Sequence, residues 1–288
     1  MSGKLIGLVA HTGKAEAADL VKRLTDEFAA RGTAIQLEEK TAKLIDAKSA
    51  GSTKQIAADC DMIVVLGGDG TILQVVHDMA ENLKPIFGIN IGSLGFLTCV
   101  GAAASSEAVK SILAESYQLS RRTLLEVEVE SGGKVLNRRI GLNDAVISRG
   151  ELSRLIKLKV EIDGALLTEY NADGLVISTT TGSTAYSLSA GGPILTPDCG
   201  VFAITPICPH VLTNRTVTVS DRSEIEIAPQ RERHEVFLTV DGLELTKIRV
   251  GDRVRIRRAK HDLPLAMPPG ISFFEVLRQK LKWSGTAI

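Results

Sequence analysis

Hydrophobic positions follow one pattern in the first hundred residues and another after about residue 120. In the first part, Leu20, Leu24 and Phe28 have helical spacing, and Gly32 is expected to end that helix. A second helix is expected over residues 71–81. Short apolar runs predict strands at 5–9, 34–37, 61–66 and 85–90. Because strands and helices alternate, this part predicts an α/β domain with a parallel sheet, whose ligands bind at the carboxyl ends of the strands.

The second part has the period-two alternation of antiparallel strands. Leu125, Val127 and Val129 alternate with glutamates, and residues 156–162 alternate in the same way. Asp163-Gly164, directly after the second run, is a hairpin signal. Further strands are expected at 216–220, 224–228, 236–240 and 253–257. These runs predict an all-β, antiparallel, sandwich-like domain.

Helical spacing returns at the end of the chain, at Phe274, Leu277 and Leu281. A short isolated helix needs a surface to pack on, so we expect this last helix to return to the first domain. The expected division is therefore an α/β domain over residues 1–100, joined by the tail 271–288, and an antiparallel β domain over residues 101–270.

Composition narrows the function classes. The 288 residues suffice for two cores, and 34 basic residues balance 34 acidic ones. Zero net charge gives no reason to expect a nucleic acid or an anionic membrane as partner. The four cysteines lack CxxC spacing and the five histidines are scattered, so we expect reduced thiols and no metal site built from protein ligands. Since no apolar run approaches bilayer-spanning length, we expect a cytoplasmic protein.

The most informative motif is the glycine-rich turn Leu66-Gly67-Gly68-Asp69-Gly70-Thr71, between an expected strand and an expected helix. Backbone N–H groups at such a helix N-terminus suit a phosphate, and Gly67, Gly68, Gly70 and Thr71 are the candidate phosphate-binding residues. A carboxylate there would repel a phosphate unless it holds a metal or accepts a proton. Asp69 therefore points to phosphoryl transfer to a hydroxyl, with Asp69 as general base. The alternative is a tight turn in which Asp69 caps the helix.

Three further segments carry polar groups. Asn143-Asp144 is either a β-turn or a pair that binds a ribose or an adenine edge. The hydroxyl-rich block from Asp173 to Ser189 is either a flexible loop with a helix cap at Thr181 or Ser183, or a polar ligand wall between a strand and a helix. Asp241-Gly242 alone indicates a hairpin turn.

Other phosphate and hydrolase motifs do not fit. The segment from Gly7 to Gly13-Lys14 is one residue too long for a Walker A loop, and Ala15 stands where Ser or Thr is needed, so we reject it. The chain also has no GxGxxG and no GxSxG motif.

In order along the chain, these segments and the turn Asn90–Leu97 resemble the NAD kinase family. GGDGT also occurs in diacylglycerol and sphingosine kinases, whereas the block Thr181-Gly182-Ser183-Thr184-Ala185-Tyr186 is far more specific. The resemblance implies ATP-dependent phosphorylation of the 2′-hydroxyl on the adenosine ribose of NAD, giving NADP. It also implies a divalent metal, with Mg²⁺ expected, and a homodimer or homotetramer. Mg²⁺ would be held mainly by ATP oxygens and water, so no dense ligand cluster is required.

The resemblance also assigns roles. Asp69 matches the family's base, with Gly70 beside it on the dinucleotide, and Phe96 matches an aromatic near the adenine. Asn143 and Asp144 match the pair that binds the nicotinamide-side ribose. Asp173 matches an acidic residue near the nicotinamide, whose contact with the ligand is usually made across a subunit boundary. Many relatives carry a basic residue in place of Asn171, which bears on the choice between NAD and NADH. The remaining NAD-binding candidates are Arg154, Thr184, Ala185, Tyr186, Ser187, Leu188, Ser189 and Asp241.

Two alternatives use the same residues differently. A lipid kinase of the diacylglycerol or sphingosine type would need an apolar pocket and a membrane-facing surface, which the hydroxyl-rich block argues against. A non-catalytic NAD-binding regulator would keep Asn143, Asp144 and Tyr186 but would not need Asp69.

Overall fold

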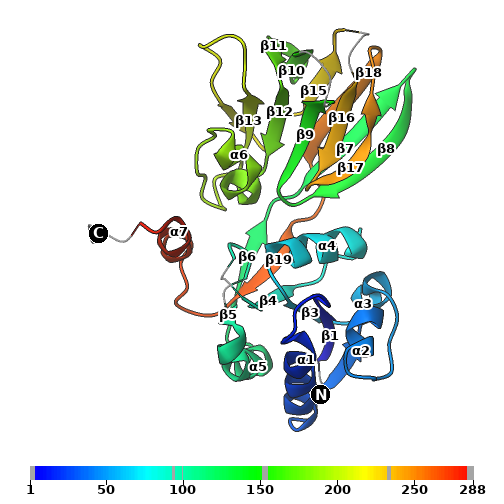
Figure 1. Ribbon diagram of the computed structural model, residues 1–288, viewed down its shortest axis with the longest axis vertical. Helices are drawn as coiled ribbons and strands as arrows, with labels where there is room; N and C mark the ends of the chain where they lie inside the picture. Colours follow the sequence, from blue (N-terminus) through cyan, green and yellow to red (C-terminus); the bar gives the residue numbers. More distant parts are fainter. Residues whose placement is uncertain (1–3, 93–94, 99, 151–154, 232–234, 284–288) are drawn as a thin grey trace. The chain divides into compact units, whose positions relative to one another are not determined.

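The computed structural model describes residues 4–92, 95–98, 100–150, 155–231 and 235–283 and divides the chain into two compact units (Figure 1). The first unit comprises residues 1–121 and 263–288, and the second comprises residues 122–262. The change of hydrophobic pattern had suggested boundaries after residues 100 and 270 instead. The structure differs because helix α5 (Ser105–Leu113) buries Val109 and Ile112 in the first core, and strand β19 (Leu263–Met267) belongs to the first sheet.

The first unit is an α/β domain, as predicted. Its sheet has the order β2-β1-β3-β4-β19-β6, with β5 paired to β4, and the pairs β1–β2, β1–β3, β3–β4, β4–β5 and β4–β19 are parallel. The remaining strands of this sheet are β1 (Leu5–Ala10), β2 (Ala34–Leu37), β3 (Met62–Leu66), β4 (Ile86–Asn90), β5 (Val100–Gly101) and β6 (Gln118–Arg122). Its helices, besides α5, are α1 (Ala17–Ala29), α2 (Glu39–Lys43), α3 (Thr53–Asp59), α4 (Asp69–Met79), α7 (Phe273–Leu281) and the short 3-10 helix η1 (Ala102–Ala104).

Sequence patterns account for this core. All five residues of β3 are buried, as expected for a parallel strand covered on both faces. On α1, the predicted stripe of Leu20, Leu24 and Phe28 is buried, and the chain turns after the helix at Gly32, which has a φ of 72°. A left-handed backbone of this kind favours glycine.

The last helix belongs to the first unit, as expected, and it buries one of the three positions that the spacing predicts. Ser272 caps α7 by accepting a hydrogen bond from the Glu275 N–H, and Val276 and Leu277 are the residues it buries. Phe274, which the spacing had placed on the packed face, is 58% exposed. The spacing located the helix and predicted the burial of Leu277 correctly, but not the exposure of Phe274.

The second unit is an antiparallel sandwich, as predicted. Its two six-stranded sheets have the orders β11-β10-β15-β18-β7-β8 and β14-β13-β12-β9-β16-β17, and side chains of both sheets share one core. The strands are β7 (Leu125–Ser131), β8 (Lys134–Gly141), β9 (Asp144–Arg149), β10 (Ile156–Ile162), β11 (Ala165–Ala172), β12 (Gly174–Ser178), β13 (Val201–Ile207), β14 (Val217–Ser220), β15 (Ile225–Pro229), β16 (Val236–Val240), β17 (Leu243–Ile248) and β18 (Asp252–Arg258). Between β12 and β13 lie the 3-10 helix η2 (Thr181–Thr184) and helix α6 (Tyr186–Ser189).

Both predicted hairpin turns are present in this unit. Asp163 and Gly164 join β10 to β11 with φ values of 52° and 79°, and Asp241 and Gly242 join β16 to β17 with 50° and 77°. Two consecutive positive φ angles are the signature of the turn that matches the twist of antiparallel strands.

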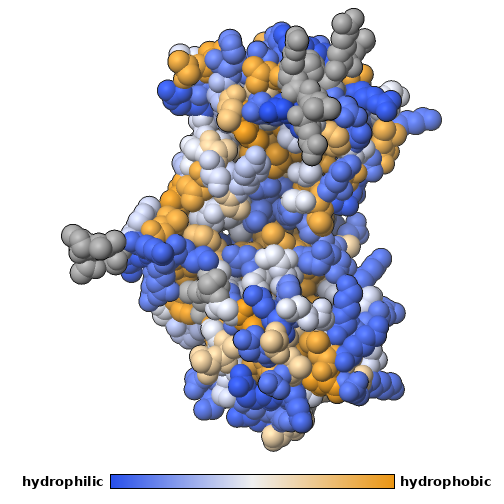
Figure 2. All heavy atoms as spheres, viewed as in Figure 1, coloured by the Kyte–Doolittle hydropathy of each residue, from blue (hydrophilic) through white to orange (hydrophobic). Residues whose placement is uncertain are grey.

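The surface mixes charged and apolar side chains on the face seen in Figure 2. Leu212 is 84% exposed and its neighbour Val211 48% exposed, in the connection from β13 to β14. None of the helices in the described part of the chain is both long and apolar enough to cross a membrane.

Candidate functional site

In the first unit, the glycine turn occupies the position that the sequence predicts. Strand β3 ends at Leu66, Gly68 is the N-cap residue of α4, and the helix begins at Asp69. A Cβ on Gly67 would lie 2.3 Å from Thr71 Oγ1, so only glycine lets the threonine hydroxyl pack against the turn. A Cβ on Gly68 or Gly70 would meet open space, so both stand free for a close approach by a ligand.

Asp69 is held by the second glycine turn. Its Oδ2 accepts a hydrogen bond from the Phe96 N–H at 2.8 Å, and its Oδ1 accepts one from the Leu97 N–H at 3.0 Å. A Cβ on Gly95 would lie 1.9 Å from Asp69 Oδ1, so the carboxylate packs directly on the glycine. The capping alternative is therefore wrong, because this carboxylate bonds another loop and Gly68 is the cap.

The two turns meet because β3 and β4 are parallel neighbours whose carboxyl ends share one edge of the sheet. The second turn has its own support: the Asn90 side-chain amide donates to Thr98 Oγ1 at 2.8 Å, and the Gly95 N–H donates to the same oxygen at 2.9 Å. Asp69 is therefore positioned by backbone groups that are themselves fixed.

In the second unit, Asn143 and Asp144 follow β8 and begin β9, and the carboxylate of Asp241 holds their backbone. Asp241 Oδ1 accepts hydrogen bonds from the Asn143 and Asp144 N–H groups at 2.7 and 3.0 Å, and Oδ2 accepts one from the Leu142 N–H at 2.7 Å. The Asp241 N–H donates in return to the Asp144 carbonyl at 2.9 Å. Asp241 is therefore both a hairpin-turn residue and the support of the Asn-Asp pair.

Asp144 is 5% exposed. Burial, together with the nearby negative charge of Asp241, raises the pKa of Asp144 to about 7. Removal from water disfavours the ionised form, and a second carboxylate disfavours it further. A carboxyl group that titrates near neutral pH is unusual and marks a functional-site candidate.

The hydroxyl-rich block divides into buried and accessible residues. Ser178, Thr179, Thr180, Thr181, Ser183 and Ser187 are at most 6% exposed. Most of these hydroxyls bond the protein itself: Thr179 Oγ1 donates to the Leu142 carbonyl at 2.6 Å, and Ser183 Oγ accepts from the Leu195 N–H at 2.7 Å. The flexible-loop alternative is wrong, because this block is folded and internally bonded.

Among the candidates in this block, Ser187 is fully buried and bonds Thr205 at 3.1 Å, so its side chain supports the block from inside. Tyr186 is 46% exposed, and Ser189 is also exposed. Thr184, Ala185 and Leu188 are partly exposed. The accessible candidates thus lie at the start and end of α6.

The block packs against the Asn-Asp pair. A Cβ on Gly182 would lie 2.0 Å from the Asn143 carbonyl oxygen, which also accepts a hydrogen bond from the Thr179 N–H at 2.9 Å. The structure therefore brings Asn143, Asp144, Asp241 and the hydroxyl block together.

Asp173 and Asn171 lie at the end of β11. The Asp173 carboxylate is ion-paired with Arg149 at 2.6 Å. The Asn171 Oδ1 atom is buried and has no hydrogen-bond partner among the described residues. Phe96, in the first unit, is partly exposed, and its ring lies 5.9 Å from Lys280 Nζ of α7. Arg154 lies outside the described residues.

Sequence reasoning did not single out Gly95, Gly182 and Arg149. The two glycines had a readable signal, since each lies in a quoted motif, but the need for glycine arises from contacts across 26 and 39 positions. The sequence carries no readable signal for Arg149, because its ion pair with Asp173 depends on the pairing of β9 with β12.

No group of three or more His, Cys, Asp and Glu side chains that could hold a metal ion occurs among the described residues. The cysteines within the described part, Cys60, Cys199 and Cys208, are free thiols.

Comparisons with known proteins agree over nearly the whole chain. The family model of the ATP-NAD kinase N-terminal domain matches residues 6–117, and that of the C-terminal domain matches residues 142–267. Proteins named NAD kinase from Geotalea daltonii and Solibacter usitatus are 41% and 39% identical, each over 97% of this chain and over 99% and 98% of their own lengths.

Two solved structures share the fold. The yeast NADH kinase complexed with NADH has a TM-score of 0.90 at 24% identity, covering 99% of this chain and 89% of that one. An NAD kinase from Archaeoglobus fulgidus in complex with ATP has a TM-score of 0.76 at 23% identity, covering 98% and 100%.

Proposed function

The chain belongs to the ATP-NAD kinase family, and from this we propose that it transfers the γ-phosphoryl group of ATP to the 2′-hydroxyl on the adenosine ribose of NAD, giving NADP. The observation that supports this most is the placement of Asp69: one carboxylate, fixed by two backbone N–H groups, inside a glycine turn at a helix N-terminus.

We propose that Asp69 acts as the general base. An alcohol is a weak nucleophile, and a carboxylate at hydrogen-bond distance removes its proton as the oxygen attacks the γ-phosphorus. The bond between the γ-phosphorus and the bridging oxygen then breaks, and ADP leaves. The bonds from Phe96 and Leu97 use one lone pair on each carboxylate oxygen, so each oxygen keeps another for the hydroxyl.

The phosphates would be bound by the N-terminus of α4. Its 11 residues give a helix dipole, and the first N–H groups have no partner within the helix. Gly67, Gly68, Gly70 and Thr71 are the proposed phosphate-binding residues, and the open space at Gly68 and Gly70 supports this role.

The donor set fits a Mg²⁺ ion that is held mainly by nucleotide oxygens. Asp69 is the carboxylate at the phosphate turn, and Mg²⁺ characteristically binds one or two carboxylates, substrate phosphates and water. When bound, the ion would offset the charge of the phosphates.

The second unit would hold NAD. Asn143 and Asp144 offer an amide and a carboxylate to a ribose diol, and the exposed ring of Tyr186 offers a stacking surface for a base. Asp173 and Asn171, whose Oδ1 has no partner within the part of the chain that the structure describes, are proposed for the nicotinamide end. Thr184, Ala185, Leu188, Ser189, Phe96 and Arg154 remain proposed contacts, and Ser187 and Asp241 act on NAD through the residues they support.

We also propose a cytoplasmic homodimer or homotetramer. The adjacent exposed side chains of Val211 and Leu212 favour a contact between copies of the chain. Light scattering coupled to size exclusion would measure the mass directly, and a monomer at micromolar concentration would contradict this proposal.

The test is to incubate the purified protein with ATP, Mg²⁺ and NAD and to measure NADP with an NADP-specific dehydrogenase. A matched reaction with diacylglycerol in place of NAD tests the lipid-kinase alternative, and chelation of Mg²⁺ tests the metal. NADP formation that is lost in Asp69→Asn supports the proposal. NAD binding without any turnover by the wild-type protein would instead favour the regulator.

A further inference from the structure

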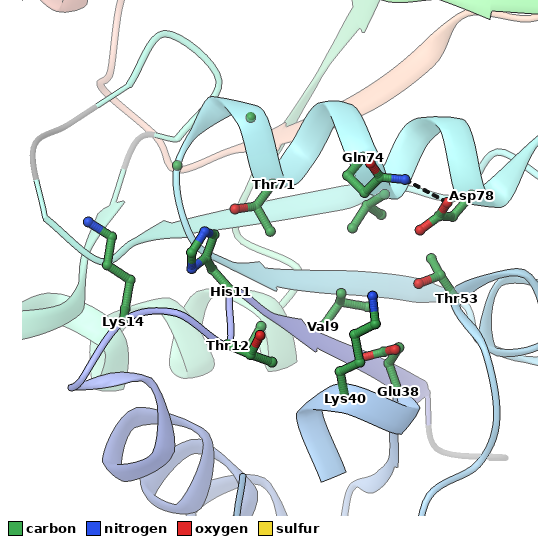
Figure 3. Close-up of a pocket in the computed structure, with 14 residues that line it drawn as sticks. Val9, His11, Thr12, Lys14, Glu38, Lys40, Thr53, Thr71, Gln74 and Asp78 are labelled. Atoms are coloured by element: carbon green, nitrogen blue, oxygen red, sulfur yellow. Dashed lines mark hydrogen bonds between the residues drawn. The ribbon is translucent and has the colours of Figure 1, made fainter. Parts of the chain in front are cut away.

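The proposed base, Asp69, is positioned by the second glycine turn and not by the cavity beside the first. That cavity, of about 490 Å³, is lined by Gly68, Gly70 and Thr71 among others, and Figure 3 shows Thr71 of α4 facing it. Asp69 is absent from the described residues that line the cavity, and its carboxylate bonds the second turn instead. The groups that fix the second turn therefore decide where the base is held.

Phe96 is the least enclosed residue in the described part of the second turn. It is partly exposed, whereas its three described neighbours in the turn are buried: Gly95, Leu97 and Thr98. Yet the Phe96 N–H donates to Asp69 Oδ2 at 2.8 Å. Because core packing restrains this ring less than it restrains the neighbouring side chains, a further contact is needed to hold Phe96 in place.

The ring of Phe96 meets a cation from the last helix. Lys280 Nζ of α7 lies 5.9 Å from the centre of the ring, within the range at which the negative face of an aromatic ring attracts an ammonium group. Both residues belong to the first unit, although they are far apart in the sequence. The contact therefore joins the C-terminal helix to the turn that holds Asp69.

Helix α7 presents Lys280 from a fixed position. Val276 and Leu277 are buried, and Lys280 follows them by four and three positions, so it lies on the same face of the helix. The helix ends in an ordered turn, in which the Trp283 N–H donates to the Arg278 carbonyl at 2.9 Å. A lysine in the last turn is also favoured by the helix dipole.

We propose that Lys280 is a positioning residue for Asp69 and acts through the ring and the backbone N–H of Phe96. The inference rests on the proposed kinase function and goes beyond it by giving α7 a part in the reaction. The ammonium group restrains the ring, and because side-chain rotamers are coupled to backbone dihedral angles, it also restrains the Phe96 N–H. Asp69 then keeps the orientation in which it receives the proton of the hydroxyl group.

Kinetics separate this role from a structural one. Lys280→Met keeps an unbranched side chain and removes its charge. Its kcat and kcat/KM should fall together by about fivefold, which corresponds to one exposed contact between a cation and a ring. Lys280→Arg should restore most of the loss, because a guanidinium group also binds the face of a ring. The matched control is Lys282→Met, an exposed lysine two positions along the chain, which should keep wild-type kcat.

A double variant shows whether Lys280 acts through the ring. In a Phe96→Leu background, Lys280→Met should cost no further activity, because both changes remove the same contact. A loss of kcat that persists without the ring would overturn the proposal, since Lys280 would then act by another route. A lowered unfolding temperature with wild-type kcat would overturn it as well, because the contact would then serve stability alone.

Nuclear magnetic resonance tests the same contacts without relying on turnover. In protein labelled with nitrogen-15 at its seven phenylalanines, the amide peak of Phe96 is identified by its loss in Phe96→Leu. This peak should move in Asp69→Asn, which changes the acceptor of the N–H, and in Lys280→Met. It should stay in place in Lys282→Met. An unmoved peak in Lys280→Met would overturn the proposal.

Failure of this proposal and failure of the kinase function are distinguishable. If the wild type makes NADP and Lys280→Met keeps wild-type kcat, the positioning role is overturned and the kinase function stands. If the wild type makes no NADP, it is the proposed function that fails, and the amide peak of Phe96 still decides whether Lys280 restrains the contact with Asp69.

Discussion

Replacing Gly95 by alanine tests whether the second glycine turn positions Asp69. The added Cβ would lie 1.9 Å from Asp69 Oδ1 and 2.5 Å from its Cγ, whereas ordinary contacts begin at 3.4 Å. The carboxylate must therefore move by about 1.5 Å, or the turn must move by the same amount. Either movement breaks the bonds from the Phe96 and Leu97 N–H groups.

The expected loss is large in turnover and small in folding. A misplacement of about 1 Å at a reacting group can cost about 10² in rate, and complete loss of a general base costs about 10²–10⁴. We therefore expect kcat to fall at least about 100-fold in Gly95→Ala, with the KM for NAD nearly unchanged. Two weakened hydrogen bonds to a partly exposed carboxylate should lower the unfolding temperature by roughly a few degrees.

NADP formation under saturating ATP and NAD measures kcat, and thermal unfolding checks the fold. Gly101→Ala is the matched control, because its Cβ would meet open space, and it should keep wild-type kcat. In an Asp69→Asn background, Gly95→Ala should cost little more, since both changes act on one group. Wild-type kcat in Gly95→Ala, or full additivity in the double variant, would refute the positioning argument.

Two other predictions concern the same reaction, and a third concerns stability. Asp69→Asn should lower kcat by about 10²–10⁴ while calorimetry still detects NAD, and near-normal kcat would end the base hypothesis. Asn143→Ala and Asp144→Ala should each raise the KM for NAD about tenfold or more with the KM for ATP little changed, whereas a purely structural turn would lower the unfolding temperature and leave both KM values unaltered. Because the pKa of Asp144 is raised to about 7, folded protein binds more protons than unfolded protein between about pH 4 and pH 7. The free energy of unfolding should therefore decline as pH rises through this window. Urea titrations should show that this free energy depends less on pH in Asp144→Asn than in the wild type, and equal slopes for the two proteins would contradict the raised pKa of Asp144.

Local patterns predicted several strands with correct or nearly correct bounds. The strands at 34–37 and 236–240 have the bounds that the sequence indicates, and β3 begins one residue later than expected. These segments have strong signals, a continuous apolar run or strict alternation between turn residues. Strand β13 was not predicted, since Val201–Ile207 contains Pro206 and shows no alternation, and its pairing with β12 and β14 decides its state instead.

The sequence predicted which residues belong to the candidate site better than it predicted the hydrogen bonds between them. The GGDGT turn and the Asn-Asp pair could be read from composition and spacing, yet the partners of Asp69 and Asp241 could not. The carboxylate of Asp241 bonds residues nearly a hundred positions away, and only the pairing of β16 with β9 brings them together.

The density of hydroxyl side chains after β12 indicated correctly that this segment is more than a flexible loop, but it did not show which hydroxyls are buried. An irregular buried turn leaves backbone groups without strand or helix partners, and short hydroxyl side chains satisfy them. Thr179 and Ser183 form such bonds with backbone groups. Their hydroxyls therefore stabilise the block, whereas Tyr186 and Ser189 are exposed.

The discontinuity of the first unit has a consequence for how the chain folds during synthesis. Strand β19 lies between β4 and β6 in the sheet, but the ribosome makes it only after the whole second unit, residues 122–262, has been synthesised. The nascent first unit must therefore wait with an open sheet edge, while the second unit can fold as one contiguous piece. Unpaired edges of this kind expose a chain to misassembly, and closing them late requires contacts of high sequence separation. Truncation before residue 263 would leave the sheet of the first unit permanently without β19, and a circular permutant that begins at β19 would restore a local folding order.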